Sequence, residues 1–311
     1  MSHGFSLGAG TVIRFQGNDR CRVLNNLSTQ DLRKLSHGQS VETFVTDVKG
    51  RTFGHGIVFG LDECVFFVSV PKQAERLVPH FDRYIIREDA VVSDQSDSYV
   101  FWIFEDRATV ALAFGLSSEQ VPGVGTATPV ELEGIDCILV HAAWVGPESF
   151  LCLVKTGAND RVIQERLGSN WVASDLETRL GWEHLRIRAS WPWYALDLDD
   201  KNLPQELDRD RFAISFNKGC YLGQETIARL DALGQVQKKL VQLSIATTSL
   251  PASQTPVYFE DKEVGTIRSA AIDTSSSPIG TVALAYVKRS CFNPGTKLLV
   301  DSAMAIVQSL S

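Results

Sequence analysis

DRFAISFNKGCYLGQETIARL, residues 210–230, is the stretch that decides how the rest of the chain is interpreted. Its apolar run at 212–216 predicts a strand, and residues 226–230 predict a helix. In the loop between them, two glycines lie on either side of Cys220. Glycine permits tight turns and the close approach of a ligand to the backbone, so this loop is the first candidate for a functional site.

Cys220 has two interpretations from the residues alone. Lys218 and the N-terminus of the helix that follows would both favour the thiolate, which would make Cys220 nucleophilic or redox-active. Alternatively, Cys220 is a small turn residue packed under Tyr221, because most lone cysteines are inert. The residues around Cys220 do not decide between these two interpretations.

The composition is that of a globular protein, with 311 residues, 44% of them hydrophobic and 22% charged. This length predicts two or three structural units. The net charge of −7 argues against general nucleic-acid binding, although it leaves room for a local basic patch. The longest apolar stretch, residues 136–154, contains charged residues and a proline, so we expect no membrane span.

The six cysteines occur singly and form no CxxC pair, and no histidine lies at metal-ligand spacing from them, so no metal site is predicted. Single cysteines fit a reducing compartment. The first ten residues, MSHGFSLGAG, have neither a basic nor an apolar region of the kind found in a signal peptide. We therefore expect a cytoplasmic protein.

The first 120 residues alternate strand and helix patterns that indicate an α+β unit. Asn18 or Asp19 is expected to cap the first helix, and Pro79 to kink or split the second, which opens at Pro71. The expected strands are 11–15, 41–46, 52–59, 64–70, 90–92 and 99–104, and the first helix is 20–27.

Residues 121–233 predict a second unit of the same kind, after a connector at 121–129. It contains strands at 137–144 and 150–155, a helix at 159–167, and a second helix that starts at a capping box, residues 174–177. From residue 234 to 311, short alternating runs separated by Gly and Pro indicate a β-barrel or sandwich of five to seven strands. The expected domains are thus 1–233, divided near residue 120, and 234–311.

The octapeptide KGCYLGQE, residues 218–225, matches the signature of the YgfZ-like proteins, which are relatives of the glycine-cleavage T-protein (the aminomethyltransferase, or GcvT, superfamily). Its residues beside the cysteine are Lys218, Gly219, Tyr221, Gly223, Gln224 and Glu225. The resemblance covers nearly the whole chain, because VLNNLSTQDL (23–32), KGRTFGHGIVF (49–59), FDRYIIREDAVV (81–92), EVGTIRSA (263–270) and GTVALAYV (280–287) also resemble family segments.

This resemblance implies an α+β, GcvT-like fold, with two ferredoxin-like subdomains around a central channel and a C-terminal β-barrel. It implies tetrahydrofolate or a folate derivative in the channel. It also implies an accessory role in iron–sulfur cluster assembly or repair, including that of iron–sulfur enzymes that modify tRNA, with Cys220 as the functional residue. The implied partners are a folate and iron–sulfur client or assembly proteins, without direct nucleic-acid or membrane binding.

The folate-channel residues that the resemblance suggests are Asn26, Thr29, Asp31, Arg188, Tyr194, Asp197 and Arg229. For the first three, a solvated turn after a helix is an equal alternative. Tyr194 belongs to an aromatic cluster with Trp182, Trp191 and Trp193, which would either stack on a pterin or form part of a core.

Two departures from the family pattern bear on function. T-proteins carry an aspartate in the stretch that resembles 49–59, where this chain has no carboxylate. A carboxylate suits proton transfer during methylene transfer, so its loss argues against that activity; His55 is a possible substitute, but a hydrogen-bonded structural histidine is the commoner case. Arg188 stands where the family has a glutamate that accepts hydrogen bonds from a pterin, and a guanidinium only donates.

Arg188 therefore leaves three possibilities: folate binds differently, the ligand is more anionic, or Arg188 pairs with a carboxylate such as Asp197. Three functions follow from the whole sequence. We favour a folate-binding accessory protein. A tetrahydrofolate-dependent aminomethyltransferase and a non-enzymatic scaffold that has lost folate are the alternatives, so whether the chain is an enzyme stays open.

Overall fold

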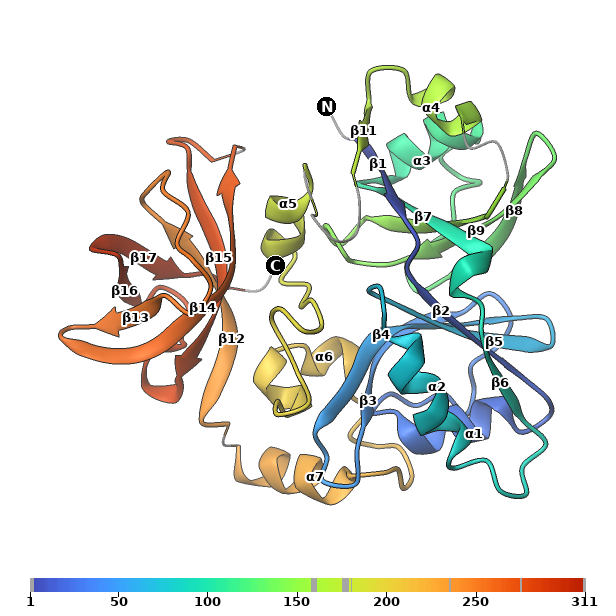
Figure 1. Ribbon diagram of the computed structural model, residues 1–311, viewed down its shortest axis with the longest axis horizontal. Coiled ribbons are helices and arrows are strands. Elements are labelled where there is room, and N and C mark those ends of the chain that lie inside the picture. Colours follow the sequence, from blue (N-terminus) through green and yellow to red (C-terminus); the bar gives the residue numbers. More distant parts are fainter. Residues whose placement is uncertain are drawn as a thin grey trace.

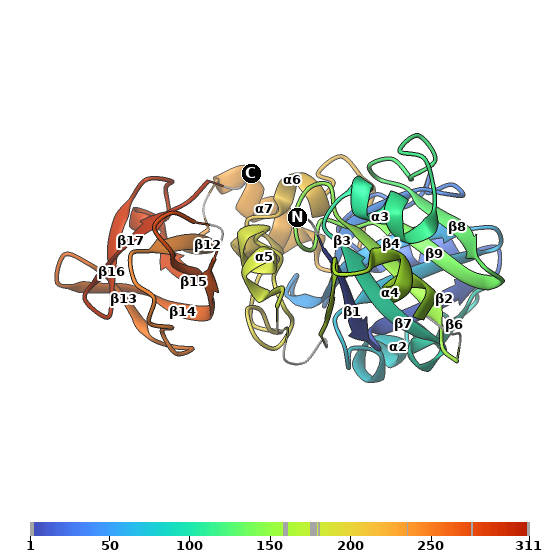
Figure 2. The ribbon, with the colours of Figure 1, turned by 90° about the horizontal axis from the view of Figure 1, so that it is seen from above.

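The computed structural model describes residues 3–157, 161–174, 179, 181–234, 236–274 and 276–309. Its strands form three sheets, and these are a five-stranded sheet, a six-stranded sheet and a closed barrel. The barrel lies at one end of the molecule and the two open sheets at the other, with a segment of short helices and loops between them (Figure 1). The same division is visible from above (Figure 2). The expected α+β architecture with a C-terminal barrel is therefore present.

The first unit is a five-stranded sheet in the order β3-β4-β5-β2-β6. Helices α1 (Arg20–Leu27) and α2 (Ala74–Asp82) cover one face, where Leu24 and Leu77 pack against Phe15 and Phe67. Antiparallel pairing joins every neighbouring pair of strands. The strands are β2 (Thr11–Gln16), β3 (Ser40–Thr46), β4 (Thr52–Leu61), β5 (Cys64–Ser69) and β6 (Val91–Asp94).

The second unit is a six-stranded sheet in the order β11-β1-β7-β10-β9-β8, covered by helices α3 (Arg107–Phe114) and α4 (Arg161–Leu167). Two of its strands precede residue 120 in the chain, so the expected boundary at that residue does not follow the sheets. The strands are β1 (Gly4–Gly8), β7 (Tyr99–Phe104), β8 (Ala127–Leu132), β9 (Ile135–His141), β10 (Phe150–Lys155) and β11 (Trp171–Ala173).

The two open sheets pack against each other through the faces that the helices leave uncovered. Phe59 and Val68 of the first sheet share one apolar core with Phe101 and Leu151 of the second. The tryptophans at 144, 182, 191 and 193 belong to the same core, and all are at least nine-tenths buried. The aromatic cluster predicted from the sequence is thus part of the core between the two sheets.

The segment from residue 181 to 234 joins these sheets to the barrel and is built from short helices. A strand was predicted at 212–216, and this was wrong. Residues 210–213 form a helical turn instead, because the Phe212 and Ala213 amides both donate to the Arg209 carbonyl. The helical elements are α5 (Glu183–Arg188), the 3-10 turn Pro204–Leu207, α6 (Asp210–Ala213) and α7 (Gln224–Leu233).

Arg186 fixes this joining segment to the barrel. Its guanidinium is fully buried and donates to Asp197 (2.7 Å), to Glu183 (2.6 Å) and to the Ser269 hydroxyl on the barrel (3.0 Å). Ser269 in turn donates to Asp197 at 2.6 Å. A buried charge is tolerated only when it is paired and hydrogen-bonded, and this network meets that condition.

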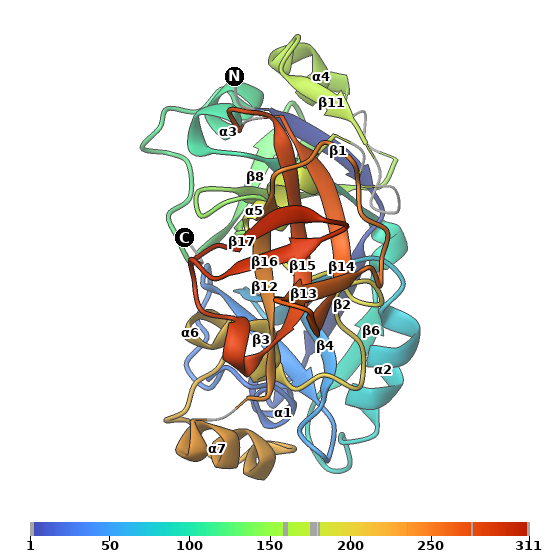
Figure 3. The ribbon, with the colours of Figure 1, turned by 90° about the vertical axis from the view of Figure 1, so that its left-hand side faces the viewer.

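The C-terminal barrel is closed by six strands in the order β12-β15-β14-β13-β16-β17, which agrees with the number expected from the sequence (Figure 3). Alternate side chains point inward, such as Leu243, Ile267 and Ala285, and form its separate core. The strands are β12 (Lys238–Ile245), β13 (Pro256–Phe259), β14 (Lys262–Asp273), β15 (Gly280–Lys288), β16 (Lys297–Val300) and β17 (Ala303–Val307).

Several local predictions need correction. Neither Asn18 nor Asp19 caps α1, because both side chains bond to residue Asp89 instead. Helix α2 begins at Ala74, three residues later than expected, and continues through Pro79 to its end at Asp82. Part of the predicted capping box at 174–177 lies outside the described residues. Among the helices that the structure describes, none is long and apolar enough to cross a membrane.

Candidate functional site

The Cys220 thiol lies in the loop between α6 and α7 and is exposed. It borders a hollow of about 290 Å³ whose other walls include Leu27 of α1, Tyr84 and Leu222. The alternative that Cys220 is packed beneath Tyr221 therefore does not describe this structure. The hollow gives the sulfur a partly apolar neighbourhood that is open to solvent.

Lys218 anchors the loop to the turn after α1. Its amine donates to the carbonyls of Asn25 (2.8 Å), Ser28 (2.7 Å) and Gln30 (2.7 Å). These three acceptors use all three of its donors, so Lys218 does not direct a hydrogen bond at the Cys220 sulfur. Burial lowers the pKa of Lys218 to about 7, and the negative charge of Asp31 opposes that shift.

Gly223 provides the second anchor, through a close contact between two backbones. Its φ is +77°, and a Cβ there would lie 2.4 Å from the Asp47 carbonyl oxygen and 2.5 Å from Gly50 Cα. A Cβ on Gly50 would lie 2.6 Å from the Gly223 oxygen. The two glycines thus allow the backbone of the β3–β4 turn to contact the backbone of the Cys220 loop directly. Thr46 secures this contact by donating to the Leu222 carbonyl at 2.7 Å.

The other motif residues divide into those that shape the loop and those that face solvent. Gln224 accepts the Tyr221 amide through its side chain at 3.1 Å and so closes the turn before α7. Glu225 is exposed in the first turn of α7, where a negative charge suits the helix dipole. Gly219 is exposed, and a Cβ there would meet its nearest atom only at 3.7 Å. A side chain would therefore fit at that position without a steric clash.

A second, larger cavity of about 450 Å³, which we call the central cavity, lies where the joining segment meets the two open sheets. Its walls come from β3 and β4, from the loops at 124–125 and 143–148, and from residues 209–212. None of the seven predicted folate-channel residues lines it. The polar and aromatic groups that do are Ser40, Glu42, His141, Glu148, Arg209, Arg211 and Phe212.

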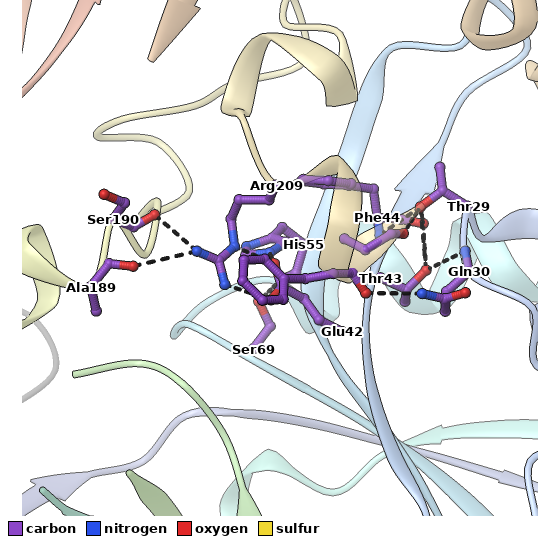
Figure 4. Close-up of polar contacts among 12 residues, drawn as sticks. Thr29, Gln30, Glu42, Thr43, Phe44, His55, Ser69, Ala189, Ser190 and Arg209 are labelled. Atoms are coloured by element: carbon purple, nitrogen blue, oxygen red, sulfur yellow. Dashed lines mark hydrogen bonds and ion pairs between the residues drawn. The ribbon is translucent and has the colours of Figure 1, made fainter. Parts of the chain in front are cut away.

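A buried ion pair forms the inner wall of this cavity (Figure 4). Arg209 donates through Nε to Oε1 and through Nη2 to Oε2 (2.6 Å) of Glu42. His55 Nε2 lies 2.8 Å from Glu42 Oε1, and the Arg209 guanidinium lies 5.0 Å from the centre of the Trp191 ring. Burial raises the pKa of Glu42, but Arg209 outweighs it and lowers that pKa to about 2.

Sequence reasoning missed both members of this ion pair. The available signal was a single carboxylate in the strand SVETFVT, whose neighbours in the sequence are mostly buried. The sequence left two roles open for His55, a group that transfers protons and a hydrogen-bonded structural residue. It is buried and stacked on Phe44 with ring centres 4.7 Å apart, which fits the structural role.

Three predicted channel residues lie instead around the Cys220 loop. The carbonyl of Asn26, which borders the Cys220 hollow, accepts the Leu222 amide at 2.8 Å. Thr29 is buried and donates to the Ala213 carbonyl at 2.6 Å, which ties the turn after α1 to α6. A hydrogen bond from Arg33 lowers the pKa of Asp31 to about 2.

The other four lie apart from both hollows. Asp197 is fully buried against Arg186, so the carboxylate that pairs with Arg188 is a different one. Arg188 contacts Asp273 of β14 at 3.2 Å. Tyr194 is half-buried beside Arg76, whose guanidinium lies 4.3 Å from its ring centre, and Arg229 is exposed on α7.

Comparison with known proteins adds sequence and structural relatives. The chain is 24% identical over 300 residues to a chloroplastic protein of Arabidopsis thaliana named as a transferase, covering 96% of this chain and 68% of that protein. It is 25% identical over 270 residues to the tRNA-modifying protein YgfZ of Yersinia pseudotuberculosis, covering 85% of this chain and 79% of that one. No protein-family model matches the chain.

The glycine cleavage system aminomethyltransferase T from Bartonella henselae has the same fold. It superimposes with a TM-score of 0.83 over 99% of this chain and 86% of its own, at 17% identity. The fold class expected from the sequence is thereby confirmed. The chain is thus similar in sequence to a YgfZ protein and shares its fold with an aminomethyltransferase, in agreement with the resemblance of the KGCYLGQE motif.

Substituting Gly223 by alanine should destabilise the fold, because the new Cβ would collide with the backbone of the β3–β4 turn at Asp47 and Gly50. We expect Gly223→Ala to lower the free energy of unfolding by about 2 kcal/mol or more, as measured by urea denaturation. Gly219→Ala is the matched control and should change it by less than about 0.5 kcal/mol. Equal effects of the two variants would contradict the proposed seating contact.

Acidification should destabilise the protein through His55. Burial lowers the pKa of His55 below its ordinary 6.5, more than the Glu42 contact raises it. Below that value the unfolded chain takes up a proton that the folded chain does not, so stability falls as the pH falls. Glu42 causes a further loss of folding stability below its ordinary pKa of 4.5, because its pKa in the folded state is about 2.

His55→Gln should therefore reduce the loss of stability between about pH 7 and about pH 5 by about 1–2 kcal/mol. Glutamine retains a donor for Glu42 but does not titrate. Urea denaturation at several pH values measures the effect, and the exposed His37→Gln serves as control. An unchanged pH profile in His55→Gln would show that His55 does not contribute in this way.

Proposed function

We propose that this protein is a tetrahydrofolate-binding accessory protein that supports tRNA modification through iron–sulfur cluster assembly or repair, and that it acts through Cys220. The relative from Yersinia pseudotuberculosis is named a tRNA-modifying protein, which supports the first part. The iron–sulfur role comes from the resemblance of residues 218–225 to the YgfZ signature. The expected partners are iron–sulfur client or assembly proteins, and the expected location is the cytoplasm.

The observation that carries the proposal is the exposure of one thiol on a loop fixed from two sides. Lys218 binds three carbonyls of the turn after α1, and Gly223 seats on the β3–β4 turn. Two other cysteines of the chain, Cys137 and Cys152, are buried in the second core and inaccessible to a partner. A rigidly held, accessible sulfur is what a thiol-dependent contact with another protein requires.

The central cavity suits a folate in size and in the chemistry of its walls. Its volume of about 450 Å³ is within the range of small-molecule sites. Phe212 offers an exposed aromatic surface, Arg211 offers a positive charge for carboxylates, and Glu42 offers an acceptor for amino groups. His141 Nε2, by contrast, already contacts the Pro147 carbonyl at 2.8 Å. A bound folate would supply a one-carbon carrier. The residues of this chain would hold and orient it.

An aminomethyltransferase activity is the second candidate, because the chain shares the fold of aminomethyltransferase T. The residue near the position of the family's aspartate is His55, which is buried in contact with Glu42 and stacked on Phe44. A group held in that way is poorly placed to exchange protons with a substrate. Tetrahydrofolate-dependent release of ammonia from an aminomethyl-lipoyl carrier tests this activity, and robust turnover would refute the accessory role.

Cys220→Ser should fold normally but fail to complement a host deficient in its own YgfZ-like protein, as judged by the activity of iron–sulfur enzymes. The hydroxyl fits the exposed position but lacks the reactivity of a thiolate. Cys64→Ser, at a half-buried thiol away from the loop, should complement fully. Full rescue by Cys220→Ser would refute the role of the thiol.

Phe212→Ala should weaken tetrahydrofolate binding about tenfold in a calorimetric titration, because the loss of a stacked ring costs about 1 kcal/mol or more. Phe216→Ala is the matched control, since Phe216 is similarly exposed but does not line the cavity. Absence of heat in the wild-type titration would favour the scaffold alternative. Equal weakening by both variants would argue against binding in this cavity.

A further inference from the structure

A third cleft, of about 350 Å³, lies between the barrel and the turn at residues 199–202. We call it the barrel cleft. Its charged lining residues are four basic side chains and two acidic ones, whereas the whole chain has a net charge of −7. The basic residues are Lys201, Lys238, Arg268 and Lys288, and the acidic residues are Asp199 and Glu263.

The acidic residues only partly neutralise this cluster. The Asp199 carboxylate is engaged by the Lys201 backbone amide at 2.8 Å, which closes the turn. Arg268 uses only Nε, on the Leu196 carbonyl at 2.9 Å, and its two terminal nitrogens have no partner among the described residues. Lys201 is exposed, and Lys288 bonds to the Glu263 carbonyl rather than to its carboxylate. Lys238 lies 3.6 Å from the Glu206 carboxylate. The donors that remain for a ligand in the barrel cleft are therefore the Lys201 amine and the terminal nitrogens of Arg268.

Tyr286 supplies a second, independent observation that points to a ligand in the cleft. Its side chain lines the cleft and only 8% of the residue is exposed. Its hydroxyl is buried and has no hydrogen-bond partner within the described part of the chain. Burial raises the pKa of Tyr286, which keeps the hydroxyl a neutral donor. A buried donor without an acceptor is costly, so a ligand or water oxygen is expected there.

We propose that the barrel cleft binds a phosphate group. Ammonium, guanidinium and tyrosine hydroxyl groups are all donors, so the complementary ligand is rich in acceptors and negatively charged. Donors approach from β14, β15 and the turn at 199–202, which suits a tetrahedral oxyanion better than a planar carboxylate. The phosphate belongs to a small diphosphate compound or to an RNA backbone. This site is independent of Cys220 and of the central cavity.

Calorimetric titration at low salt with two probes, inorganic pyrophosphate and a short RNA hairpin, tests the proposal. We expect one of them to bind, with an affinity that falls as salt rises. Lys201→Glu should weaken that binding about tenfold or more, because it reverses an exposed charge at the cleft. Lys297→Glu makes the same charge change elsewhere on the barrel and should leave affinity unchanged. The probe that binds identifies the source of the phosphate.

Tyr286→Phe distinguishes a ligand donor from a structural residue. It removes only a hydroxyl that has no partner, so the thermal midpoint should stay the same or rise while probe affinity falls. A lower midpoint with unchanged affinity would mean that the hydroxyl is structural and would overturn the assignment. Failure of both probes to bind, or equal weakening by Lys201→Glu and Lys297→Glu, would also overturn the phosphate site.

Discussion

The contact between Arg209 and Glu42 is the constraint on which the arrangement of this protein depends. It joins residues separated by 167 positions and buries both charges. Burying a guanidinium costs desolvation free energy, which pairing with a carboxylate in bidentate geometry offsets. The pairing therefore fixes the position of the joining segment relative to Glu42. Arg186 does the same toward the barrel through Asp197 and Ser269. Two buried arginines thereby position a segment that has almost no sheet pairing of its own.

The same logic explains how the cysteine loop is presented. The loop is held by the backbone carbonyls that surround the Lys218 amine and by the Gly50–Gly223 contact, which leaves no space for a side chain on either glycine. Most of the motif therefore fixes the conformation of the loop, and the residues that do so are Lys218, Gly223 and Gln224. Cys220, Gly219 and Glu225 are the members that this conformation leaves in solvent. Some residues of the octapeptide thus hold the loop in place, and the others are exposed to solvent.

The sequence predicted most elements whose signal is local. The barrel followed from alternation and from Gly and Pro between the runs, and α1, β7 and β10 were predicted with their observed bounds. The run at 212–216 misled because a short apolar stretch does not distinguish strand from helix. The two cavities lay beyond sequence reasoning. Glu42 and Arg209 meet only in the folded chain, and Asn26, Thr29 and Asp31 turned out to border the Cys220 loop.

Strand β1 has a consequence for how the chain folds during synthesis. It lies inside the second sheet, antiparallel to β7 and parallel to β11, although the first unit separates it from both along the chain. As the polypeptide leaves the ribosome, β1 stays unpaired until the first unit and then β7, which ends at Phe104, have been made. The first unit can thus assemble early, whereas the second must recruit a strand already held at the other end of the growing chain.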